Sequence, residues 1–241
     1  MDFYKKLPQV PLIQNNRDYL VKYCTGKRVL HLGCVDAGVL EEKFQQGDLL
    51  HQRLAAVTQD LWGFDIDKRG IEFLRSKGFS QLYQGDVTQV SALRELQQFS
   101  FDVILAGEIV EHLLNPGLFF DAIKTLMQPN HTELIVTVPN AYGTDGLVAM
   151  LRRNECVHPD HNYWFSYSTI TTLIQKCGYQ IKAVNPYSNQ FFPFLSRPKQ
   201  SGLLRYFASL GKRTLVRTLY RMTPFWGDGI TVIATTGNNE E

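Results

Sequence analysis

Short apolar runs recur along the chain at intervals of about 20–30 residues, and a turn and a helical pattern follow most of them. The first five runs cover residues 28–32, 61–65, 81–84, 102–106 and 133–138. Strands that alternate with helices form parallel sheets covered on both faces. Residues 179–184 and 229–234 supply two more strands, and we expect the last to be antiparallel because a long segment joins it to its predecessor. The pattern predicts an α/β fold: a Rossmann-like, doubly wound, mostly parallel sheet of seven strands.

Ionisable side chains gather directly after the strand at 102–106. Glu108, Glu111 and His112 follow it at spacings of three and four residues, which would place them on one side of a helical turn. Ligands of open α/β sheets bind at the carboxyl ends of the strands. The spacing therefore predicts a cluster of ligating groups at the rim of the sheet, with a solvated turn as the alternative.

Acidic residues also follow the second and third strands. Asp65 is placed to accept both hydroxyls of a ribose, and Asp86 to accept the exocyclic amine of an adenine. The first turn, residues 33–38, lacks the second glycine of the dinucleotide fingerprint, and Asp36 would repel a pyrophosphate. A cationic nucleoside without phosphates fits this turn better than a nicotinamide dinucleotide. The alternative is that Asp65 and Asp86 are helix N-caps.

These motifs, together with the segments 29–38, 63–67, 85–87 and 101–116, resemble those of class I S-adenosylmethionine-dependent methyltransferases, over roughly residues 27–185. The resemblance implies that Gly33 contacts the methionine part, Asp65 the ribose and Asp86 the adenine. His31 stands where the family usually has an acidic residue, so Asp36 becomes the candidate partner of the methionine amino group. The complete set of expected cofactor contacts is Gly33, Cys34, Asp36, Asp65, Ile66, Asp86, Val87 and Ala106.

Within that family, residues 108–112 resemble the E-x-x-E-H motif of the ubiquinone-pathway O-methyltransferases and the small-RNA 2′-O-methyltransferases. The resemblance implies a divalent metal, and the ligand types leave Mg²⁺, Mn²⁺, Fe²⁺ and Zn²⁺ as candidates. His161, which precedes a phenylalanine and a helix start, is the expected downstream ligand, and His158 is its competitor. The implied metal ligands are Glu108, Glu111, His112 and His161. His161 or His112 is the expected general base when it is not a ligand.

We expect one domain over residues 1–241, because 44% hydrophobic content supplies a sizeable core. Residues 1–26 are expected to form an arm and a short helix, and residues 141–165 a long functional connection. Residues 186–227 form an insertion with an aromatic stretch and a basic helical pattern. The lack of a signal peptide pattern and of a long apolar run, together with scattered cysteines, predicts a cytoplasmic location.

A metal beside the methyl group favours a hydroxyl acceptor, because the ion lowers the pKa of a bound hydroxyl. The basic insertion indicates an anionic acceptor of small-molecule or glycan type, or a peripheral contact with an anionic membrane. Nucleic acid is less favoured because the net charge is only +2. RNA 2′-O-methylation, N-methylation with a structural E-x-x-E-H cluster, nicotinamide-dependent oxidation and a silent partner subunit remain the alternatives. The oligomeric state stays open.

Overall fold

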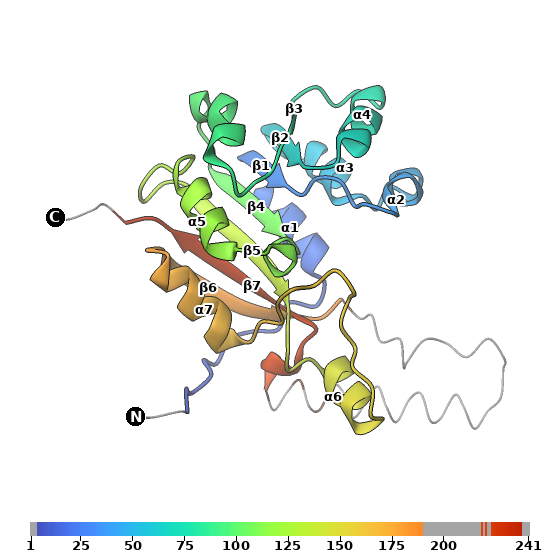
Figure 1. Cartoon of the computed structure of the whole chain (residues 1–241), viewed down its shortest axis with the longest axis vertical. Coiled ribbons are helices and arrows are strands. Elements are labelled where there is room, and N and C mark those ends of the chain that lie inside the picture. The colour runs from blue at the N-terminus through green and yellow to red at the C-terminus, as the bar shows by residue number, and fades with distance from the viewer. Residues whose placement is uncertain (1–3, 190–217, 219, 221–222, 238–241) are drawn as a thin grey trace.

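The computed structural model describes residues 4–189, 218, 220 and 223–237. Seven strands form one sheet in the order β3-β2-β1-β4-β5-β7-β6 (Figure 1). The strands are β1 (Arg28–Leu32), β2 (Asp60–Asp65), β3 (Leu82–Gln84), β4 (Val103–Gly107), β5 (Glu133–Pro139), β6 (Gln180–Tyr187) and β7 (Gly229–Thr235). Strand β7 runs antiparallel to both of its neighbours, β5 and β6, whereas the other neighbouring strands pair in parallel. The predicted fold class is confirmed.

Helices cover both faces of the sheet. The α-helices are α1 (Asn16–Cys24), α2 (Leu40–Gln46), α3 (Leu50–Ala55), α4 (Lys68–Ser76), α5 (Pro116–Lys124), α6 (Thr144–Leu151) and α7 (Tyr167–Lys176). The 3₁₀-helices are η1 (Val90–Gln98), η2 (Val110–His112) and η4 (Pro224–Trp226). Within the described part of the chain, no helix combines the length and the apolar character needed to cross a bilayer.

The core has a layer on each side of β1 and β4, because successive side chains of a strand point to opposite faces. Leu30 and Ile104 belong to the layer that packs with α5 and α7, through side chains such as Phe119 and Ile170. Val29 on the opposite face packs with side chains of α1 and α3. Both layers are largely apolar, which fixes the strand register and therefore the positions of the residues that follow each strand.

Several local predictions differ from the structure. The connection at 141–165 contains α6, which stands outside the two helical layers in Figure 1. The helix expected at 89–98 is a 3₁₀-helix. Strand β6 continues through Pro186 to Tyr187, so the insertion begins later than residue 186; proline is tolerated because β6 is an edge strand. Most of the insertion at 186–227, including its basic and aromatic residues, lies outside the described residues.

Candidate functional site

A cavity of about 700 Å³ opens at the carboxyl ends of β1, β2 and β4, the edge at which open α/β sheets bind ligands. Its walls come from the first turn, from the ends of β2 and β3, from the segment after β4, and from α1 and α3. Gly33, Cys34, Asp36, Asp65, Ile66, Asp86, Val87, Glu108 and His112 all line it. The structure therefore brings most of the residues expected to contact the cofactor into one space.

Asp65 lies at the end of β2 and is 9% exposed. Its two carboxylate oxygens accept backbone N–H groups, Oδ2 from Val35 at 2.8 Å and Oδ1 from Asp67 at 2.9 Å. Burial raises the pKa of Asp65, and these two N–H groups oppose that effect. The N-cap of α4 is Asp67, whose side chain accepts from the Arg69 N–H, so the cap interpretation of Asp65 is wrong.

The first turn approaches the segment after β4 closely. Gly33 has a φ of +65°, and a Cβ placed there would lie 2.9 Å from Cδ1 of Ile109. A side chain at this position would therefore strain the backbone and collide with Ile109. Because Asp65 binds the N–H of Val35 two residues later, the turn is held against β2 as well. The result is a fixed backbone surface beside the cavity.

Asp86 follows β3 and closes a local turn. Its Oδ1 accepts the N–H of Thr88 at 2.9 Å and the Thr88 hydroxyl at 2.7 Å. These hydrogen bonds lower the pKa of Asp86, so the group stays ionised at the wall of the cavity. The N-cap of the following helix η1 is Gln89, so Asp86 is not a helix cap either.

Two of the expected cofactor contacts fit less well. Asp36 forms an ion pair with Lys43 of α2 at 2.5 Å, so its charge is already neutralised by a protein cation. Ala106 is fully buried within β4, and the neighbouring Gly107 lines the cavity in its place. A free carboxylate for the methionine amino group is therefore not supplied by Asp36 in this conformation.

His31 occupies the end of β1 at the position where the resembled family has an acidic residue. It is 3% exposed, and its Nδ1 lies 3.2 Å from Nδ1 of His51 in α3, with the two rings stacked. Burial lowers the pKa of His31 to about 4 and that of His51 well below its usual value. Both imidazoles are therefore neutral at pH 7, one donating its Nδ1–H to the other.

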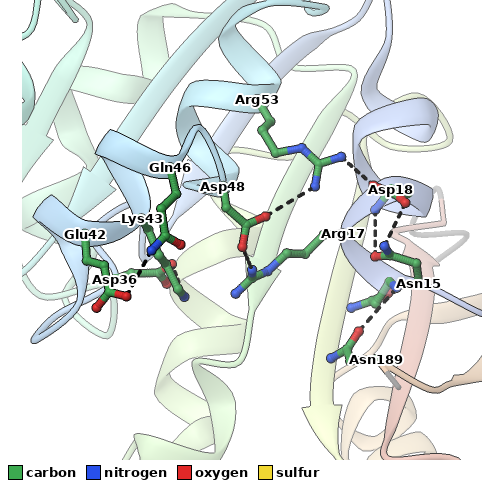
Figure 2. A network of polar contacts seen from close by, with 11 residues as sticks. Asn15, Arg17, Asp18, Asp36, Glu42, Lys43, Gln46, Asp48, Arg53 and Asn189 are labelled. Carbon is green, nitrogen blue, oxygen red and sulfur yellow. Dashed lines mark hydrogen bonds and ion pairs between the residues drawn. The ribbon is translucent and has the colours of Figure 1, made fainter. Parts of the chain in front are cut away.

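Ion pairs join α1 to α3 and to Asp48 between α2 and α3, as Figure 2 shows. Arg17 of α1 pairs with Asp48 at 2.5 Å. Arg53 of α3 pairs with Asp18 at 2.5 Å and with Asp48 at 3.7 Å. Since Arg17 lines the cavity, this network joins the wall formed by α1 to the wall formed by α3.

Glu108 stands directly after β4 in an uncommon backbone conformation, with a φ of +54°. It precedes the 3₁₀-helix η2, so the expectation that one helical turn presents all three residues of the E-x-x-E-H motif is wrong. The Glu108 side chain opens to solvent through the cavity, although protein atoms crowd around it. This crowding raises the pKa of Glu108. Strained backbone at non-glycine residues is concentrated at functional sites.

Glu111 is 0% exposed, and neither of its carboxylate oxygens has a hydrogen-bond partner among the described residues. Burial, and next the charge of Glu108, raise the pKa of Glu111 to about 9. A buried carboxylate without a partner is costly when it is ionised. Such a group keeps a proton, which it can share with the Glu108 carboxyl, or binds a cation.

The loop around residue 161 is fastened to this turn by backbone contacts. The N–H of Asn162 donates to the Glu111 carbonyl at 2.8 Å, and the Asn162 side-chain amide donates to the His112 carbonyl at 2.7 Å. The rings of His112 and His161 meet edge to face with centroids 4.5 Å apart. His158 is farther away, at 6.0 Å from His112.

One ligand atom from each of Glu111, His112 and His161 lies within 4.8 Å of the other two. The Nδ1 of His112 contacts the carbonyl of Asp160 at 3.1 Å, and a carbonyl only accepts, so this nitrogen carries the proton. The remaining Nε2 is then free to ligate, the usual arrangement of a histidine at a metal site. Burial and the two neighbouring imidazoles lower the pKa of His161, which favours its neutral, ligating form. Glu108 is not part of this close group.

Two residues at the site were missed by the sequence reasoning. Thr137 donates to Glu108 Oε1 at 3.0 Å, and Tyr187 donates to the same oxygen at 2.5 Å. Thr137 is the one polar residue in the apolar run 134–138, which is a usable signal. Tyr187 lies three residues beyond the predicted end of the strand at residues 179–184.

A sequence profile of the family described as "Methyltransferase domain" matches residues 11–184. The chain belongs to this family. As a member, it is an S-adenosylmethionine-dependent methyltransferase, and the cavity at the carboxyl edge is where its cofactor is expected.

Relatives of this methyltransferase include two ubiquinone biosynthesis O-methyltransferases. The protein from Aeromonas salmonicida is 27% identical over 69% of this chain and 70% of its own length. The protein from Paraburkholderia phymatum is 32% identical over 44% of this chain and 42% of its own length. The methyltransferase thus spans less than half of the second relative.

Solved structures share the fold. A S-adenosylmethionine-dependent methyltransferase from Archaeoglobus fulgidus gives a TM-score of 0.54 at 18% identity, over 91% of this chain and 90% of that chain. The small RNA methyltransferase HEN1 gives 0.57 at 16% identity, over 94% of this chain and 25% of that one. At these identities the likeness extends to the architecture and no further.

Proposed function

We propose that this methyltransferase transfers a methyl group to a hydroxyl of a small-molecule or glycan-type acceptor with the help of a divalent metal. One observation carries the proposal: Glu111 is fully buried, and both of its carboxylate oxygens lack a partner among the described residues. His112 and His161 offer ligand atoms within 4.8 Å of it. A cation at this point would satisfy the carboxylate and both imidazoles together.

The chemistry of the donors fits a divalent ion. One carboxylate and two imidazoles suit Mn²⁺, Fe²⁺ or Zn²⁺ better than Mg²⁺, which prefers oxygen ligands. Asp160 fixes the tautomer of His112, so one imidazole is already prepared for ligation. The Glu108 carboxyl is near enough to raise the pKa of Glu111, and it would add negative charge to the same place.

One end of the cavity would bind the cofactor, and the other end would bind the acceptor. The first turn, Asp65 and Asp86 would hold the nucleoside, with Asp65 aligned by two backbone N–H groups. The acceptor would lie beside His112 and Glu108, which line the cavity after β4. A bound divalent ion would lower the pKa of the acceptor hydroxyl. The oxygen then forms the new O–C bond as the C–S bond of the sulfonium breaks, S-adenosylhomocysteine leaves, and the hydroxyl proton passes to a base.

The transfer is an in-line displacement, so positioning supplies much of the acceleration. A vicinal diol or a catechol would chelate the ion and would be held in one orientation. The names of the relatives, which are O-methyltransferases, support oxygen as the acceptor atom. Where His161 does not bind the metal, it is the candidate general base that takes the proton of the acceptor hydroxyl.

The proposal is tested by measuring isotope transfer from labelled S-adenosylmethionine with metal-depleted protein. Catechols, sugar nucleotides, glycans and RNA ends are screened with and without added Mn²⁺. We expect transfer only with metal, while S-adenosylhomocysteine raises the melting temperature of the protein in both conditions. Full transfer in the presence of a chelator would contradict metal assistance. Transfer to RNA ends alone would replace the small-molecule acceptor.

A further inference from the structure

Tyr187, the last residue of β6, reaches across the sheet to the segment after β4. Its side chain is 2% exposed, and its hydroxyl donates to Glu108 Oε1 at 2.5 Å. Strands β7 and β5 lie between β6 and β4, so this contact joins strands that are not neighbours. The phenol thus forms part of the cavity wall on the side of the motif.

Gly229 makes this path possible. It pairs with Tyr187 in the register of β6 and β7. A Cβ added to Gly229 would lie 2.0 Å from Cζ of the Tyr187 ring and 2.2 Å from its hydroxyl oxygen. The ring therefore occupies the space where any other side chain at position 229 would begin, which is a recognised reason for glycine within a strand.

Two hydroxyl groups clamp one oxygen of Glu108. Tyr187 and Thr137 both donate to Oε1, from β6 and β5 respectively. The Thr137 oxygen also accepts the Glu108 N–H at 3.2 Å, so main chain and side chain are held together. Both contacts are to Oε1, and neither hydroxyl donates to the second oxygen, Oε2. The backbone of Glu108, with its φ of +54°, is held in place by the same contacts.

The end of β6 is itself rigidly held. The carbonyl of Pro186 accepts the Ile13 N–H at 2.9 Å, and the Ser188 N–H donates to the Ile13 carbonyl at 2.8 Å. Asp228 Oδ2 accepts the Ser188 hydroxyl at 3.1 Å and the Asn189 N–H at 2.9 Å. Hydrogen bonds therefore hold the residues on either side of Tyr187 to Ile13 of the N-terminal arm and to Asp228, which precedes β7.

We infer that Tyr187 is a positioning residue for methyl transfer: its hydroxyl holds Glu108 Oε1, so that Oε2 is available as a further ligand for a cation held by Glu111, His112 and His161. The inference rests on the proposed metal-assisted function. Groups that orient metal-binding carboxylates act through the ligand, and their loss typically lowers metal affinity or activity by about 10–100-fold.

The test uses the full-length chain with Tyr187→Phe, which removes the hydroxyl and keeps the ring. Mn²⁺ alone is titrated by electron paramagnetic resonance, and transfer is measured with a simple catechol. We expect Mn²⁺ affinity and kcat to fall by about 10–100-fold, with the KM for S-adenosylmethionine unchanged. Tyr23→Phe is the matched control, because Tyr23 also donates to a glutamate, Glu133, at 2.7 Å, but from α1 to the opposite end of the sheet.

Gly229→Ala provides a second route, since its new methyl group would push the ring from Glu108 without removing the hydroxyl. The same loss in this variant supports the inference, and it decides the matter if Tyr187→Phe does not fold. Wild-type Mn²⁺ affinity and kcat in a folded Tyr187→Phe variant would overturn it. Failure of the proposed function is seen separately, as wild-type protein that neither binds Mn²⁺ nor depends on it, and the inference falls with it.

Discussion

Strand β4 has carboxylates at both of its ends, and the protein treats them in opposite ways. At the amino end, Asp102 accepts from the Arg28 guanidinium at 2.8 Å and contacts Nε2 of His131 at 3.1 Å. These partners, chiefly Arg28, lower the pKa of Asp102 to about 2. At the carboxyl end, Glu111 has no partner among the described residues, and burial raises its pKa to about 9.

The difference separates a carboxylate with structural partners from one that we propose binds a ligand. Asp102 also accepts the Arg28 N–H at 2.8 Å, so it joins β1 to β4 at the base of the sheet. Arg28 and His131 of the same chain supply the hydrogen-bond partners of Asp102. Glu111 lies at the ligand edge, and the chain places two histidines near it but no donor on its oxygens. An incomplete set of partners in a buried position indicates that something else completes it.

Among the variants that test this comparison, Glu111→Gln should have the largest effect. The variant should lose transfer by roughly 100-fold or more, because it removes a charged ligand from the site. Its free energy of unfolding without metal should be equal to or above that of the wild type, since a costly buried carboxyl is gone. Steady-state kinetics and urea unfolding check the two effects. A folded variant with wild-type kinetics would remove Glu111 from the mechanism.

The pH dependence of stability should differ between metal-free and metal-bound protein. The folded pKa of Glu111 is raised, so its protonated form is the stable one in the fold. Its contribution is fully present below the unfolded value of about 4.3 and is lost as pH rises through about 9. In a series of thermal scans, the melting temperature of metal-depleted protein should therefore fall as pH rises from about 5 to about 9, because the folded state binds more protons than the unfolded state in this range. Added Mn²⁺ should suppress the decline, and Glu111→Gln should lack it. A flat profile in the metal-free wild type would argue against the raised pKa.

Asp65 extends the comparison to a carboxylate at the ligand edge that does have partners. Asp65→Ala should weaken S-adenosylmethionine binding by about 2 kcal/mol, the scale of a lost charge-assisted hydrogen bond. Calorimetry on the folded variant measures this. Unchanged affinity would mean that Asp65 serves only to brace the Val35 N–H.

The smallest effect is expected at the amino end of β4. Asp102→Asn should lower the melting temperature by about 2–4 °C and leave kcat unchanged. The pKa of Asp102 is depressed, so its stabilisation is present above the unfolded value of about 3.9 and is lost as pH falls through about 2. In acid titrations, the free energies of unfolding of the wild type and of Asp102→Asn should therefore become equal at the lowest pH. A loss of activity without a loss of stability would reverse the roles assigned to the two ends.

Much of this arrangement was predictable from the sequence. The apolar runs determine the strands, and the carboxyl ends of parallel strands meet at one edge, so Asp65 and Asp86 had to come near each other. His161 was expected beside the motif because the segment after β5 emerges next to β4. The structure places its ring 4.5 Å from that of His112.

Other features depend on tertiary contacts that no local pattern reports. His51 pairs with His31 because α3 packs across β1, and the surrounding sequence carries no sign of that partner. The contact of Tyr187 with Glu108 depends on the order of β7 and β6 in the sheet and on the lack of a side chain at Gly229. The positive φ of Glu108 likewise follows from bonds to β5 and β6, and helical spacing alone suggested a different shape.

The position of β7 has a consequence for synthesis of the protein on the ribosome. Strand β6 pairs in the sheet with β7 alone, yet β7 comes later in the chain. During translation β6 therefore has no sheet neighbour until Gly229–Thr235 has left the exit tunnel, whereas β1 to β5, which come earlier in the chain, can already pair. The edge of β5 is open during that interval, and an open edge invites pairing with other chains. Nascent chains stalled before residue 229 should accordingly depend on chaperones more than chains released after it.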